Sequence, residues 1–239
     1  MKIIITIISI IIIIIVRTVI ISSTSVNTTE TEVMVVRDIT DIQLSQPKSD
    51  DIARLFDLGN SQWNGAKFRF IDISDVSYNQ TFEASINAEN QWMGNEFDRQ
   101  KKIKAFYAEM SRILNDVGKE TIGKNNSSVY FPIANELNKL SKSKSSKKIL
   151  LIYSDLMENT DEMSFYDKEK FNLLTTHPDL IKKYFDSQVP LASLQGINIY
   201  IIFQANGTAE DEQFQVVSGF YKNLFESKGA TVEISANLN

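Results

Sequence analysis

The stretch KKILLIYSDLMENT, residues 147–160, joins an unbroken apolar run to a polar segment. The run, residues 149–153, is long enough for a β-strand and short for a typical helix. A strand without polar alternation is typical of the centre of a parallel sheet, because both of its faces are covered. Open α/β sheets bind ligands beyond the carboxyl ends of their strands, so Ser154 and Asp155 mark a candidate site.

A second stretch has the same form. Residues 33–36, Val-Met-Val-Val, are followed by Arg37, Asp38, Ile39, Thr40 and Asp41. Two apolar strands that each end in a hydroxyl and a carboxylate predict one polar site at a single edge of the sheet.

Periodic patterns place the other elements around these two strands. Apolar runs and alternation predict strands at 66–75, 81–87, 197–203 and 231–234. Apolar residues at helical spacing predict helices at 50–59, 94–117, 129–140, 168–174, 178–185 and 211–228. Strands that alternate with helices predict one α/β domain, residues 32–239. Its sheet is expected to be doubly wound and mostly parallel, with helices on both faces and a short antiparallel edge strand at 81–87.

The first residues predict export. Lys2 precedes the apolar run 3–16, which Arg17 interrupts and residues 18–21 continue. The run has the length of a signal-peptide core, and residues 3–21 reach about the minimum membrane span if Arg17 snorkels. Residues 1–22 are therefore predicted to be a signal peptide or a membrane anchor, and the small residues that follow favour the signal. Residues 23–31 are predicted to form a flexible spacer. Because Lys2 places positive charge on the cytoplasmic side, the domain is expected on the periplasmic or extracellular side.

Composition excludes several classes of function. The 239-residue chain has a formal net charge of −5 with interspersed charges, and it lacks the basic face of a nucleic-acid-binding protein. It has no cysteine, which excludes disulfides, thiolate metal sites and cysteine nucleophiles. Neither a Gly-rich dinucleotide motif nor a P-loop occurs. The one histidine, His177, is interpreted as a cap or surface residue, so no Ser-His-Asp triad is predicted.

The loop after residues 33–36 resembles the first loop of the metal-ion-dependent adhesion site in the von Willebrand factor A family. That loop has the pattern Asp-x-Ser-x-Ser, and here the sequence is Asp-Ile-Thr-Asp-Ile. Asp38 matches the aspartate, Thr40 matches the first serine in its chemistry, and Ile42 replaces the second serine. Asp41 or Gln43 could supply the oxygen that Ile42 lacks, or the site could be vestigial.

The family's other two loops also have counterparts. The second loop offers a threonine just before a helix, and Ser127 or Ser128 holds that position. The third offers an aspartate at the end of an apolar strand, which is Asp155. The resemblance covers about residues 32–238, including the order of the strands and helices.

The resemblance implies a binding module. Its ligands for Mg²⁺ or Mn²⁺ would be Asp38, Thr40, Ser127 or Ser128, and Asp155, all hard oxygen donors. Because few of them carry charge, the ion stays electrophilic and a partner's carboxylate can complete its coordination. The implied function is non-enzymatic binding of a protein partner, by an exported domain that is membrane-tethered if the N-terminal segment is retained.

Other interpretations stay open at this point. A Mg²⁺-dependent phosphoester hydrolase would use Asp38 and Asp155, although the second carboxylate of an Asp-x-Asp-x-Thr site is missing. A scaffold with an inactive metal site is the third possibility. Taken one by one, both aspartates could cap turns and the serine pair could begin a helix.

Three further residues have a structural interpretation. Glu158 lies near Asp155 but is interpreted as part of a solvated loop. Trp63 and Trp92 are interpreted as residues of core or interface packing, with exposed partner-binding residues as the alternative.

Overall fold

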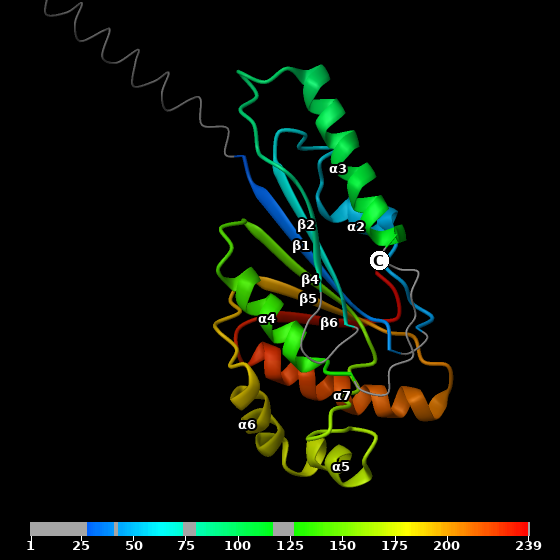
Figure 1. The fold of residues 1–239 in the computed structure, drawn as a ribbon. Helices are drawn as coiled ribbons and strands as arrows, with labels where there is room; N and C mark the ends of the chain where they lie inside the picture. The colour runs from blue at the N-terminus through cyan, green and yellow to red at the C-terminus, as the bar shows by residue number, and fades with distance from the viewer. Residues whose placement is uncertain (1–27, 41–42, 74–79, 117–126, 239) are drawn as a thin grey trace, which may run out of the picture.

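The computed structural model describes residues 28–40, 43–73, 80–116 and 127–238, which Figure 1 shows as a layered α/β fold. The predicted signal or anchor, residues 1–22, lies outside the described residues, as do Asp41 and Ile42. Within the described ranges, no helix is both long enough and apolar enough to cross a membrane.

The described strands form one twisted sheet. They are β1 (Glu30–Asp38), β2 (Gly65–Ile73), β3 (Thr81–Ile86), β4 (Lys147–Tyr153), β5 (Ile197–Ile202) and β6 (Thr231–Ser235). Their order across the sheet is β3-β2-β1-β4-β5-β6, and only β3 runs antiparallel to its neighbour. The predicted class, a mostly parallel sheet with one short antiparallel edge strand, is confirmed. Because β1 begins at Glu30, the last two residues of the predicted spacer belong to the strand.

Helices cover both faces of this sheet, as predicted. One face carries α2 (Ser49–Leu55) and α3 (Glu96–Asp116) (Figure 1). The other carries α4 (Tyr130–Ser141), α5 (Lys168–Thr176), α6 (Pro178–Gln188) and α7 (Thr208–Glu226).

The sheet separates two apolar cores. Successive residues of a strand point to opposite faces, so Val33 and Val35 of β1 pack towards α2 and α3. Met34 and Val36 pack into the core that includes α4, α6 and α7. Asp38 is two residues beyond Val36, so its side chain continues the row that faces α4.

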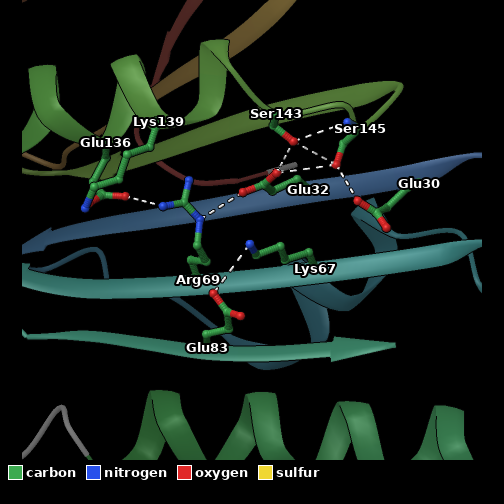
Figure 2. Close-up of polar contacts among 9 residues, drawn as sticks. All are labelled: Glu30, Glu32, Lys67, Arg69, Glu83, Glu136, Lys139, Ser143 and Ser145. Carbon is green, nitrogen blue, oxygen red and sulfur yellow. Dashed lines mark hydrogen bonds and ion pairs between the residues drawn. The ribbon is translucent and has the colours of Figure 1, made fainter. Parts of the chain in front are cut away.

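Three side chains lie where the periodicity did not place them. Phe97 was predicted to face inward from α3, but it is exposed, whereas Arg99 is fully buried. Arg99 is buried because its guanidinium donates hydrogen bonds to loop carbonyls beneath the start of α3. In β2, Arg69 is a polar position of an alternating strand, yet it is buried in an ion-pair cluster with Glu32 and Glu136 (Figure 2).

Candidate functional site

Strands β1 and β4 lie side by side where the chain reverses the direction in which it builds the sheet. After β1 it adds β2 and β3 on one side, and it then places β4, β5 and β6 on the other. Such a switch point opens a crevice beyond the carboxyl ends of the two strands, where open α/β sheets bind ligands. Asp38 ends β1 and Ser154 follows β4. Because Arg37 stands opposite Tyr153, Asp38 and Ser154 leave the sheet at the same level.

Asp38 is the centre of a hydrogen-bonded group. Its Oδ1 accepts hydrogen bonds from the Thr40 N–H at 3.0 Å and the Thr40 hydroxyl at 2.6 Å. Its Oδ2 accepts one from the Ser154 hydroxyl at 3.1 Å. The structure thus brings the predicted residues Asp38 and Thr40 together and adds Ser154, which was not among the predicted ligands.

Asp155 begins a tight turn beyond β4. Its Oδ1 accepts a hydrogen bond from the Met157 N–H at 3.0 Å, while Ser154 Oγ accepts one from the Leu156 N–H at 2.9 Å. Leu156 has a φ of 63°, a left-handed conformation that is uncommon for a residue with a side chain. Two neighbouring side chains therefore hold this turn in place, and Asp155 has the turn-forming role that its position allowed.

Ser127 and Ser128 lie in different surroundings. The backbone of Ser127 exchanges two hydrogen bonds of 2.8 Å with Asn159, which brings the second loop against the segment after β4. The Ser128 hydroxyl bonds to Glu158. The Ser127 hydroxyl is buried and has no hydrogen-bond partner within the described part of the chain. A buried polar group left without a partner costs about 1–3 kcal/mol, so this one requires an explanation.

Glu158 caps helix α4 from a distant part of the sequence. Its Oε2 accepts hydrogen bonds from the N–H groups of Val129 at 2.9 Å and Tyr130 at 2.8 Å. The N-cap residue, Val129, has no polar side chain of its own to do this. The interpretation of Glu158 as a solvated loop residue was wrong, since it is only 2% exposed. No local pattern could reveal the cap, because it acts across 28 residues.

Burial raises the pKa of Glu158 to about 7, and the nearby charge of Asp38 adds to the rise, against the hydrogen bonds from the helix N-terminus. A carboxyl whose pKa is raised on folding stabilises the fold below its unfolded pKa, and this contribution is lost as the pH rises through 7. The difference from the usual glutamate pKa of 4.5 corresponds to about 3 kcal/mol.

We therefore expect Glu158→Gln to flatten the fall in stability between pH 5 and pH 8, because glutamine can still accept a hydrogen bond but does not ionise. Urea unfolding at a series of pH values in a chelator measures the difference between the two profiles. Glu162→Gln, an exposed carboxylate in the same segment, is the matched control and should leave the profile unchanged. Parallel profiles for Glu158→Gln and the native chain would contradict the assignment.

Two clefts flank the turn after β4. One has a volume of about 440 Å³ and is lined by Ser128, Glu158 and Tyr184, among others. The other has a volume of about 400 Å³ and is lined by Asp155, Tyr166 and the first turns of α7. The carboxyl ends of β1 and β4 therefore open onto a hollowed surface on both sides.

We call the hydrogen-bonded group Asp38, Thr40 and Ser154, together with Asp155 of the adjoining turn and Ser127 of the loop paired with the segment after β4, the strand-end site. In the part of the chain that the structure describes, no three or more Asp, Glu, His or Cys side chains stand close enough to hold a metal ion. The strand-end site has two carboxylates and three hydroxyls, so a cation there would rely on hydroxyl oxygens and retained water. That donor set suits Mg²⁺ or Mn²⁺, which prefer oxygen ligands and keep part of their hydration.

Two more buried polar groups lie close to this site in sequence or space. The Gln43 side-chain amide has no hydrogen-bond partner among the described residues, and neither does the Tyr221 hydroxyl. Burial raises the pKa of Tyr221, and the charges of Glu158 and Asp155 act in the same direction.

His177 is exposed between α5 and α6, as its position predicted.

No protein-family model and no curated protein matches this chain. The likeness to the von Willebrand factor A family therefore rests on the residues of the three loops and on the order of the strands and helices.

Proposed function

We propose that this chain is an exported binding domain that engages a protein partner at the strand-end site, with Mg²⁺ or Mn²⁺ as part of the contact, as in von Willebrand factor A domains. The observation that carries the proposal is the buried hydroxyl of Ser127, which has no partner in the described structure. A cation ligated by this oxygen would explain why the hydroxyl is kept at a buried position.

Asp38, Thr40, Ser127 and Asp155 would hold the ion. Ser127 is favoured over Ser128, because the Ser128 hydroxyl is already bonded to Glu158. Gln43, whose buried amide oxygen also lacks a described partner, would supply the donor that Ile42 cannot. The bound ion would attract an acidic side chain of the partner, and the protein side chains would fix its position at the crevice between β1 and β4.

The surface around Asp155 supports a macromolecular partner. Asp155 lines a cleft of about 400 Å³ together with Met157, Tyr166, Asn206 and Phe214. Of these side chains Tyr166 is exposed, at 58%, and aromatic residues are enriched where proteins bind one another. A cleft that combines an exposed tyrosine with the candidate metal ligand offers both contact area and a site for a carboxylate.

The chain enters the described structure at the end of β1 opposite the strand-end site. Residue 28 enters the described structure at the amino end of β1, whereas the strand-end site lies at the carboxyl end of the same strand (Figure 1). A domain held at its amino end would therefore present the strand-end site away from the membrane.

Ser127→Ala and Ser128→Ala form a matched pair that tests the proposal. We expect Ser127→Ala to weaken Mn²⁺ binding by roughly 10–100-fold or more. Losing a residue that only supports a metal ligand already weakens binding by that factor. Ser128→Ala should retain the affinity within a few-fold. Paramagnetic resonance of free Mn²⁺ in a titration measures both dissociation constants, and a pulldown with an acidic-peptide library then tests whether a carboxylate partner requires the ion.

Equal affinities for the two variants would contradict the role of Ser127. Mn²⁺ binding that survives Asp38→Ala and Asp155→Ala would place the ion elsewhere and contradict the strand-end site as a whole.

A further inference from the structure

Three large apolar side chains stand exposed close together in the loop before α3 and in its first turn. Trp92, Met93 and Phe97 are 75%, 87% and 69% exposed, more than any other large apolar side chain in the described ranges. We call them the apolar tip. A single exposed apolar residue is ordinary, whereas a group of this size marks a surface that binds something.

The apolar tip is firmly held by the residues beneath it. Arg99 is fully buried, and its Nε and Nη1 donate hydrogen bonds to the carbonyls of Gln62 at 2.6 Å and Asn87 at 2.8 Å. Gly94 lies against the ring of Trp63 so closely that a Cβ there would come within 2.1 Å of a ring atom. A loop fixed in this way presents its apolar side chains without a large loss of conformational entropy on binding.

The apolar tip lies at the end of the domain where the chain enters. Thr29 donates a hydrogen bond to Asn64 Oδ1 at 3.1 Å and accepts one from the Gly65 N–H at 2.9 Å. Arg99 also donates to the Asn64 carbonyl. Asn64 therefore links the start of β1 to the start of α3. Figure 1 shows the loop before α3 on the same side as the start of β1, and α5 and α6 on the far side.

The predicted membrane segment, residues 3–21, is separated from the start of the described structure by only a few residues. Residues 3–21 are apolar apart from Arg17, Ser9 and two threonines. The eight residue steps from residue 21 to Thr29 span at most about 28 Å when fully extended. An anchored segment would therefore hold the amino end of the domain near the bilayer surface.

Lysines accompany the apolar side chains at this end. Lys101 Nζ lies 4.3 Å from the ring centroid of Phe97. Lys147 starts β4 opposite Thr31 of β1, and Lys144 is exposed in the turn before it. Lys101 also lies 3.9 Å from Asp98. An aromatic ring with a lysine over its face suits the boundary between lipid headgroups and acyl chains, where the lysine can reach phosphate while the ring is buried.

We propose that the apolar tip inserts into the interface of the lipid bilayer in which residues 3–21 are anchored. The domain is then held at the membrane at two points, with the strand-end site turned away from the lipid. The inference rests on the export proposed above, and it adds that the N-terminal segment stays in the membrane.

The chain has no cysteine, so one introduced cysteine carries a single fluorophore. Met93→Cys labels the apolar tip, and Leu180→Cys is the matched control, because it replaces another exposed apolar residue on α6, on the far side (Figure 1). The full chain is made by cell-free synthesis with phosphatidylcholine–phosphatidylglycerol vesicles and labelled with nitrobenzoxadiazole. We expect blue-shifted emission from residue 93 that spin-labelled acyl chains quench, and emission from residue 180 that only aqueous iodide quenches.

Each other outcome overturns the inference in a distinct way. If the chain does not float with the vesicles, the tether and the membrane contact both fail, while metal binding at the strand-end site is unaffected. If the chain floats but residue 93 stays open to iodide, the tether stands and the apolar tip does not touch lipid. If residue 93 is shielded from both quenchers, a protein covers the apolar tip.

Discussion

Replacing Arg69 with methionine is expected to lower the free energy of unfolding by about 3–5 kcal/mol. Arg69 of β2 is buried between the sheet and α4, where its Nε donates to Glu32 at 2.9 Å and its Nη1 donates to Glu136 (Figure 2). The substitution keeps the apolar stem but removes the cation, so two carboxylates remain buried without it. Breaking a buried ion pair from one side costs more than the pair contributes, because the remaining charge is uncompensated. Urea unfolding measures the loss.

Lys67→Met is the matched control for this prediction. Lys67 lies two residues earlier on the same face of β2, and its 3.5 Å pair with Glu83 is largely open to solvent (Figure 2). We expect its loss to change stability by less than about 0.5 kcal/mol. Adding Glu32→Gln and Glu136→Gln to Arg69→Met should restore a large part of the stability. An Arg69→Met loss as small as that of Lys67→Met would contradict the importance of the buried cluster.

Replacing Arg99 with methionine is expected to cost about 3–5 kcal/mol, because three partly buried carbonyl groups lose hydrogen bonds to a charged donor. These are the carbonyls of Gln62, Asn64 and Asn87, which belong to the two loops beneath the start of α3. The same change should speed hydrogen exchange in residues 87–95, since Arg99 joins these loops to the helix. Urea unfolding and exchange measured by mass spectrometry report the two effects.

Arg112→Met, on the same helix, provides the comparison. Arg112 is exposed, and its pairs with Glu109 at 2.6 Å and Asp116 at 3.4 Å lie on the helix surface. Its loss should change stability by less than about 0.5 kcal/mol. Equal effects of the two substitutions would mean that water replaces the Arg99 guanidinium at all three carbonyls.

The class of the fold was predictable because its strongest signals are local. Residues 33–36 and 149–153 are buried on both faces, and uninterrupted apolar strands of this kind occur in parallel sheets. The end of α7 was also predictable: Gly229 has a φ of 98°, and the Ala230 N–H donates back to the Phe225 carbonyl. Each of these signals lies within a few residues of the structure that it specifies.

The burial of Arg69 and Arg99, which periodicity did not predict, depends on partners that are distant in sequence. Arg69 looks like a solvent-facing position in an alternating strand, but Glu136 on α4 neutralises it 67 residues later. Arg99 takes the buried position near the start of α3, and Phe97 is left exposed. Periodicity alone cannot foresee either result, because it counts apolar side chains and not the groups that satisfy a buried charge.

The candidate site was predicted only in part, for the same reason. Asp38 and Thr40 lie within one short loop, and their contact is local. Ser154 reaches Asp38 across 116 residues, and Glu158 reaches the start of α4 across 28. These long-range contacts also decide that the Ser128 hydroxyl is bonded while the Ser127 hydroxyl has no partner in the described structure.

The most direct test of metal-dependent binding at the strand-end site is a calorimetric titration of the full chain, in detergent, with MnCl₂ and MgCl₂. We predict saturable binding of one ion, and a melting temperature that rises with metal concentration because the ion binds only the folded state. Asp38→Ala should abolish both signals. The absence of heat and of thermal stabilisation with either metal would contradict the proposed function.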